Sequence, residues 1–133
     1  MAFAEPWFEL SEEELDERTH LIAVSGEIHV STAPEFSQRL NDAIGRGKTA
    51  VVLDLSGTEF IDSTGLSVLL NGLRRVTRAH GRMALIVTNP TVLRLFQITR
   101  LDSTFDIAAD RDEALSLVQR RRQPAGGSTA GAP

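Results

Sequence analysis

The order of apolar and polar residues predicts strands that alternate with helices. Two short strands are expected near the start, at residues 7–10 and 20–25, and the acidic stretch at residues 11–18 is expected to connect them as a hairpin. The segments "LIAV" and "MALIV" are nearly all apolar, which is typical of strands covered on both faces. The later apolar runs predict strands at residues 49–56, 83–89 and 105–108.

Four helices are predicted from apolar residues that recur at helical spacing. In the first, Thr32 and Glu35 have the spacing of a capping box. The second follows the sequence "DSTG", and the third is expected to be capped by Asn89. The fourth is expected to occupy residues 110–122, with acidic residues in its first turn and arginines in its last.

This order indicates the α/β class. Helices between strands imply right-handed crossovers and a mostly parallel sheet, to which the first hairpin adds an antiparallel edge. We therefore predict one domain over residues 1–122, with about four helices, and a disordered tail at residues 123–133, which are rich in Pro, Gly and small residues.

Composition narrows the possible functions. The chain has 133 residues, which suits one domain, and a net charge of −4, which disfavours direct binding of nucleic acid. It has no cysteine, which excludes disulfides, thiol catalysis and thiolate metal sites. No apolar run approaches the roughly 20 residues that span a bilayer, and the start has no signal-peptide pattern. We expect a cytoplasmic protein without a membrane segment.

The segment "VVLDLSGTEFIDSTGLSVLL", from Val51 to Leu70, has the polar residues of "DSTG" between a predicted strand and a predicted helix. In open α/β sheets, ligands and chemistry gather at this end of the strands. Asp62 or Ser63 could simply cap the helix. Alternatively, since three capping-type side chains occur where one suffices, the junction could present one hydroxyl for chemistry. Gly65 costs the helix roughly 1 kcal/mol relative to alanine and is expected to leave the backbone uncovered for a partner surface.

Other candidate sites are weaker, and we predict no catalytic or metal site and no cofactor. The "GRGKT" at residues 45–49 follows a helix, the reverse of a phosphate loop's context. Asp54 is interpreted as a structural residue near a strand end, and Ser63 lacks the surroundings of a hydrolase nucleophile. The histidines have no metal-ligand spacing; His20 is expected to be exposed, and His29 to lie in a loop near "DSTG".

From about Phe8 to Val118 the chain resembles the STAS domain, specifically the small free-standing anti-sigma factor antagonists of bacteria. The most specific landmark is an apolar strand followed by "DSTGL" at the start of a helix. The looser landmarks, which occur in the right order and spacing, are "VSGEIHVSTAPEF", "NPTVLRLFQITRLDSTFDI" and "ADRDEAL".

The resemblance implies that the unmodified protein binds an anti-sigma factor and so releases a sigma factor. It also implies that this anti-sigma factor is a serine kinase that phosphorylates Ser63, and that a metal-dependent serine phosphatase reverses the modification. Where many family members have an aspartate near the acceptor, this chain has His29, which is expected to affect recognition by the kinase. The implied partner-binding loop consists of Asp62, Ser63, Thr64, Gly65, Glu27 and His29.

The physics of the junction permits such a switch. A phosphate adds a charge of about −1.5 to −2, which free N–H groups and the positive end of a helix would stabilise. The fold should survive, and only the surface should change. A second hypothesis is a STAS-type scaffold or sensor module without sigma-factor control. We expect a monomer, because no second large apolar stripe is left over.

Overall fold

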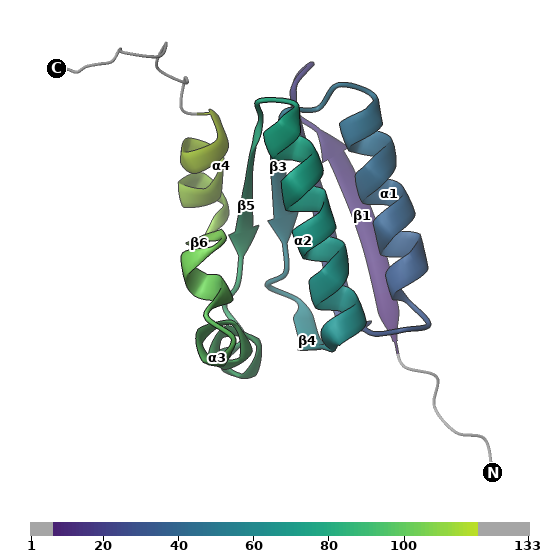
Figure 1. Ribbon diagram of the computed structural model, residues 1–133, viewed down its shortest axis with the longest axis vertical. Helices are drawn as coiled ribbons and strands as arrows, with labels where there is room; N and C mark the ends of the chain where they lie inside the picture. Colours follow the sequence, from purple (N-terminus) through teal and green to yellow (C-terminus); the bar gives the residue numbers. More distant parts are fainter. Residues whose placement is uncertain (1–6, 120–133) are drawn as a thin grey trace, which may run out of the picture.

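Strands and helices alternate in a computed structural model of the chain that describes residues 7–119 (Figure 1). The predicted tail and the arginines predicted to end the last helix lie outside the described residues. The elements are β1 (Phe8–Glu14), β2 (Thr19–Ile28), α1 (Ala33–Gly45), β3 (Ala50–Asp54), β4 (Thr58–Ile61), α2 (Ser63–Arg78), β5 (Arg82–Ile86), α3 (Pro90–Ile98), a 3-10 helix (Leu101–Ser103), β6 (Asp106–Ala108) and α4 (Arg111–Gln119).

These strands form one sheet in the order β1-β2-β3-β5-β6, and β4 also pairs with β2. β1 runs antiparallel to β2, and the other pairs are parallel. The predicted class is therefore confirmed: a mostly parallel sheet with an antiparallel N-terminal edge hairpin and four α-helices within the described residues.

The edge strand β1 is longer than predicted. Residues 11–14 were expected to belong to the connection, but β1 continues through Glu14, which pairs with His20. An edge strand tolerates charged side chains, and the charges here find partners. The glutamates near the end of β1 pair with cations from other parts of the chain: Glu12 with Arg39, Glu13 with Arg111 and Glu14 with Lys48.

β1 also buries His20, so its predicted exposure is wrong. The residue is 3% exposed, and its Nε2 lies 2.7 Å from Oε1 of Glu12 on the neighbouring strand. Glu12 also accepts a hydrogen bond from Arg39 of α1 at 2.6 Å. A strand-start histidine thus becomes part of a charged cluster between β1, β2 and α1.

The short strand β4 was not predicted. β2 is long enough to pair first with β3, over Thr19–Ala23, and then with β4, over Gly26–Ile28. β4 therefore continues the sheet where β3 has ended. It also fixes the point from which α2 begins, two residues after Ile61.

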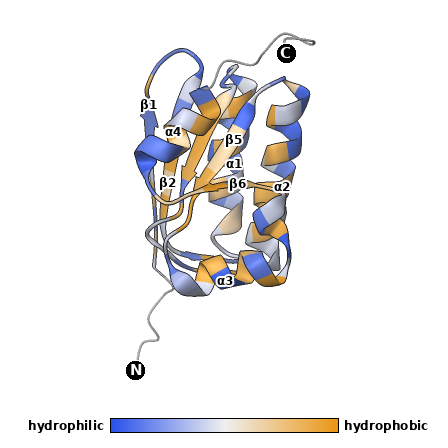
Figure 2. Cartoon of the chain, turned by 90° about the vertical axis from the view of Figure 1, so that its left-hand side faces the viewer, coloured by the Kyte–Doolittle hydropathy of each residue, from blue (hydrophilic) through white to orange (hydrophobic). Residues whose placement is uncertain are grey.

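Helices cover both faces of the sheet, which is apolar between them (Figure 2). α1 and α2 pack on one face of the sheet, where the core is made of large aliphatic and aromatic side chains; α4 packs on the other face, where alanines predominate. The buried helical residues include Phe36, Leu40, Leu69 and Val76 on the first face and Ala114 and Val118 on the second.

Candidate functional site

At the start of α2, different residues of "DSTG" cap the helix and present a hydroxyl to the surface. Asp62 is the N-cap: its Oδ1 accepts a hydrogen bond from the N–H of Gly65 at 3.0 Å. Its own N–H donates to the carbonyl of Ile28 at 3.1 Å, which ties the cap to the end of β2. Ser63 is the first residue of the helix and is exposed. Since the cap does not use it, the Ser63 hydroxyl is available to a docking protein, and it has no hydrogen-bond partner in the described structure.

The local electrostatics favour negative charge at Ser63. The first turn of a helix leaves N–H groups without intrahelical acceptors. Asp62 takes one of them, because its side chain accepts from the N–H of Gly65, while its carbonyl accepts the first helical bond, from Leu66 at 3.0 Å. The N–H groups of Ser63 and Thr64 remain. α2 also has no acidic residue in its first turn, so a phosphate there would meet amide dipoles, and the carboxylate next to it in the sequence, that of Asp62, is bound to the N–H of Gly65.

Gly65 has a different role from the one expected. It is buried, so its backbone is not open to a partner surface, and that expectation is wrong. A Cβ at this position would lie 2.6 Å from Cγ1 of Ile61 and 2.8 Å from Cγ2 of Ile28. The glycine is therefore needed for α2 to approach β2 and β4 closely. This contact sets the position of Ser63, two residues earlier.

A tight turn between β2 and α1 lies beside this junction, because Ile28, which bonds Asp62, directly precedes it. Thr32 fastens the turn: its Oγ1 accepts from the N–H of His29 at 2.9 Å and donates to the carbonyl of Glu27 at 2.8 Å. The predicted capping box with Glu35 is wrong, because Thr32 makes no side-chain cap of α1. Its hydroxyl is already engaged in the turn.

The His29 ring is held in one tautomer. Its Nδ1 accepts a hydrogen bond from the N–H of Ser31 at 3.2 Å and lies 3.0 Å from the Ser31 hydroxyl. The neutral ring therefore carries its proton on Nε2. Nε2 is buried without a hydrogen-bond partner, 3.9 Å from Oε1 of Glu27. Glu27 and His29 thus share one turn next to Asp62, but no hydrogen bond or ion pair joins either side chain to Ser63 in the described residues.

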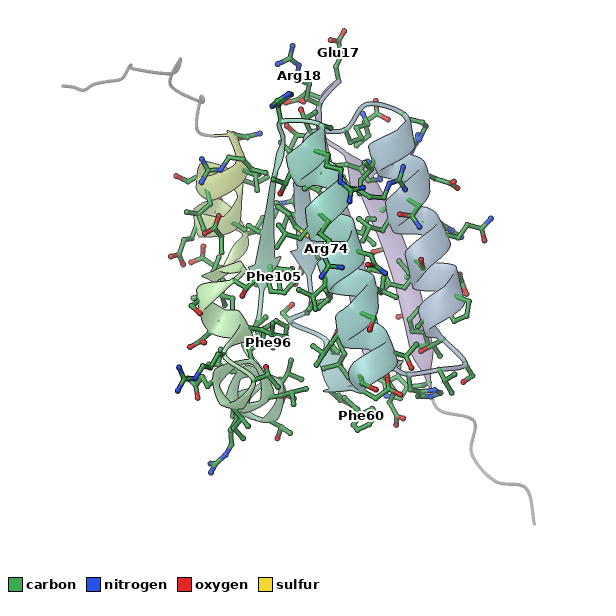
Figure 3. The ribbon with its side chains drawn as sticks, viewed as in Figure 1. Glu17, Arg18, Phe60, Arg74, Phe96 and Phe105 are labelled. Carbon is green, nitrogen blue, oxygen red and sulfur yellow. The ribbon has the colours of Figure 1, made fainter. Side chains whose placement is uncertain are left out.

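Two exposed apolar side chains at this end of the molecule were missed by the sequence analysis. Phe60 on β4 is 48% exposed and Val30 in the turn is 69% exposed. Figure 3 shows Phe60 beside the start of α2, pointing away from the core. The signal in the sequence was weak: Phe60 alternates with buried Ile61 in a strand that itself escaped prediction. Both side chains can supply apolar contact area around Ser63.

The Glu12 carboxyl lies in a cluster with His20 and Arg39. Burial acts to raise the pKa of the Glu12 carboxyl, but hydrogen bonds and charge from His20 and Arg39 outweigh it and lower the pKa below its ordinary value.

Over residues 7–119, no group of three or more His, Asp or Glu side chains could hold a metal ion. None of the helices described is long and apolar enough to cross a membrane.

The sequence of the chain matches a known family. The model of the STAS domain matches residues 12–114, which include the junction and most of the sheet. The chain belongs to the STAS family.

Relatives of this chain match it over most of its length. A protein of Thermotoga neapolitana is 35% identical over 96 residues, which are 71% of this chain and 85% of that protein. An anti-sigma F factor antagonist of Paenibacillus polymyxa is 30% identical over 100 residues, 74% of this chain and 86% of the relative. The crystal structure of an anti-sigma factor antagonist from Mycobacterium paratuberculosis has a TM-score of 0.79 and 30% identity, and covers 87% of this chain and 97% of that one.

Proposed function

We propose that this STAS protein is an anti-sigma factor antagonist. Its unmodified form binds an anti-sigma factor and thereby releases a sigma factor to RNA polymerase, which places its action in the cytoplasm. The names of its relatives support this role. The observation that carries it is the exposed Ser63 at a junction where another residue, Asp62, makes the helix cap.

Phosphorylation of Ser63 is the proposed off-switch. The anti-sigma factor acts as a serine kinase: the Ser63 oxygen attacks the γ-phosphorus of ATP, ADP leaves, and the hydroxyl proton is released. A metal-dependent serine phosphatase hydrolyses the phosphoserine and restores the binding form. The antagonist supplies the acceptor and no catalytic group, so it is not itself an enzyme in this cycle.

The surface around Ser63 supports a switch of binding rather than of folding. Unmodified, Ser63 is neutral and has the exposed Phe60 and Val30 at the same end of the molecule, which suits an apolar contact with a partner. A phosphate converts the centre of that contact into a dianion that resists desolvation. Because Ser63 is exposed and the caps of α2 do not involve its hydroxyl, the core need not rearrange.

The experiment is phosphorylation by candidate anti-sigma factor kinases with ATP and magnesium, measured by intact mass. One added phosphate is expected on the wild type and none on Ser63→Ala. Ser67→Ala is the matched control, since Ser67 is exposed on the same helix one turn later; it should be phosphorylated like the wild type. Phosphate retained on Ser63→Ala would contradict the assigned acceptor.

Binding assays separate this role from the alternative of a scaffold without sigma-factor control. Ser63→Glu should weaken binding of the anti-sigma factor at least about tenfold, roughly 1.4 kcal/mol, while Ser67→Glu should change it much less. If no anti-sigma factor binds the unmodified protein, the scaffold function is favoured instead.

A further inference from the structure

The outer face of α2 connects Ser63 to a row of arginines. Successive helical residues turn by about 100°, so the exposed residues of this face fall within about 80° around the helix axis. With a rise of about 1.5 Å per residue, Arg74 lies about 16 Å and Arg78 about 22 Å from Ser63 along the axis. Figure 3 shows Arg74 projecting from the middle of α2, away from the sheet. The exposed residues of this face are Ser63, Ser67, Asn71, Arg74 and Arg78.

The charge of these arginines is not balanced by carboxylates among the described residues. α2 contains three of them and no acidic residue. Nη1 of Arg74 donates to Oδ1 of Asn71 at 3.2 Å, and Nη1 of Arg75 donates to Oδ1 of Asn41 at 2.6 Å. Both acceptors are neutral amides. Arg74, Arg75 and Arg78 form no ion pair with any residue that the structure describes, and α2 therefore has a charge of about +3 on a protein whose net charge is −4.

Elsewhere several cations are neutralised within the fold. Arg39 pairs with Glu12 at 2.6 Å, Arg111 pairs with Glu13 at 3.0 Å, and Arg82 lies 3.7 Å from Asp106. Arg74, Arg75 and Arg78 are unlike these residues, because they are concentrated on one helix and pair with no carboxylate in residues 7–119.

The helix dipole explains part of this arrangement. Arg75 and Arg78 lie in the last turn of α2, where a cation stabilises a helix by about 0.3–1 kcal/mol. That effect acts on stability alone. It gives no reason for Arg74 and Arg78 to share one strip of the helix with the proposed phosphoacceptor.

We propose that Arg74 and Arg78, with Arg75 at their edge, form a second docking contact for the protein that phosphorylates Ser63, and that the contacting surface of this partner is rich in Asp and Glu. The inference rests on the proposed function. A partner that reaches Ser63 and extends along the outer face of α2 would meet these guanidinium groups, which favour carboxylates. Phosphorylation then lowers the charge of α2 from about +3 to about +1. The same acidic surface is attracted less after transfer, which favours release of the product.

The test measures association rates with the kinase that phosphorylates Ser63. Arg74→Gln/Arg78→Gln should lower the association rate about tenfold at low salt, and high salt should shrink this difference. Arg18→Gln/Arg94→Gln is the matched control: both residues are exposed and unpaired in the described structure, and the double variant loses the same charge. It should bind within about twofold of the wild type. Arg74→Lys/Arg78→Lys should keep the wild-type rate and tests the charge independently of folding.

Equal association rates for the α2 variant and the control, with wild-type phosphorylation intact, would overturn the docking contact and leave the proposed function standing. A wild type that the kinase neither binds nor phosphorylates would overturn both. Equal loss of rate in the Gln and Lys double variants would also overturn the inference, because charge would then not be the cause.

Discussion

The two ends of the sheet use their polar groups in opposite ways. At the end where β3 begins, the buried Lys48 donates to the carbonyls of Asp16 and Glu17, each at 3.0 Å, and lies 3.2 Å from Oε2 of Glu14. At the end where α2 begins, the Ser63 hydroxyl is exposed and makes no hydrogen bond to any residue that the structure describes. Polar groups that are paired inward maintain the fold, and an unpaired exposed group beside apolar side chains is available to a partner.

The largest expected effect on stability is at Lys48, the only lysine of the chain. Lys48→Met leaves two carbonyls without their donor and should lower the free energy of unfolding by about 2–3 kcal/mol, measured by urea denaturation. The control Arg94→Met removes an exposed cation and should cost less than about 0.5 kcal/mol. If the two variants were equally stable, the paired polar groups around Lys48 would not maintain the fold, and the proposed difference between the two ends of the sheet would be wrong. Binding of the anti-sigma factor should persist in folded Lys48→Met protein.

At the end of the sheet that carries Ser63, the position of the start of α2 depends on close packing at Gly65. Gly65→Ala puts a Cβ within 2.6 Å of Ile61 and should destabilise the protein by about 1–3 kcal/mol. It should also lower the rate of Ser63 phosphorylation by displacing the start of α2. The control is Gly45→Ala in α1, where nothing lies within 4 Å of the new Cβ; it should be neutral or stabilise slightly. Thermal melting of both variants checks this, and an unchanged Gly65→Ala would contradict the close approach.

The sequence predicted the α/β architecture, the helix starts at Asn89 and Asp110, and the junction itself, because these depend on local patterns. The side chain of Asn89 caps α3 as expected, and Asp110 accepts from the N–H of Glu113 at 2.8 Å. The burial of His20, the true role of Gly65 and the strand β4 depend on contacts between distant segments. A local pattern does not contain those contacts. The charges of β1 therefore suggested a loop, and Gly65 suggested an exposed backbone.

A smaller effect is expected from pH at the Glu12 cluster. Because the pKa of Glu12 is lowered in the folded protein, its carboxylate contributes stability above its unfolded pKa, and this contribution is lost as pH falls through the lowered value. Glu12→Gln should therefore lower the free energy of unfolding by about 1 kcal/mol at neutral pH. The difference from the wild type should disappear in acid. A constant difference at all pH values, measured by urea denaturation, would contradict this linkage.

The smallest expected effect on stability is at Ser63. Ser63→Ala removes an exposed hydroxyl without a partner and should change the free energy of unfolding by less than about 0.5 kcal/mol. It should nevertheless abolish phosphorylation. If Ser63→Ala lost as much stability as Lys48→Met, Ser63 would be a structural residue, and the proposed difference between the two ends of the sheet would be wrong.

The most direct measurement is melting and anti-sigma factor binding on one sample of protein phosphorylated at Ser63, beside unmodified protein. We expect the melting temperature to shift by no more than a few degrees, since a change of about 1 kcal/mol moves it by roughly 4 °C, while affinity falls at least about tenfold. If the phosphorylated protein unfolds, or if it binds the anti-sigma factor as tightly as the unmodified form, Ser63 is not a surface switch.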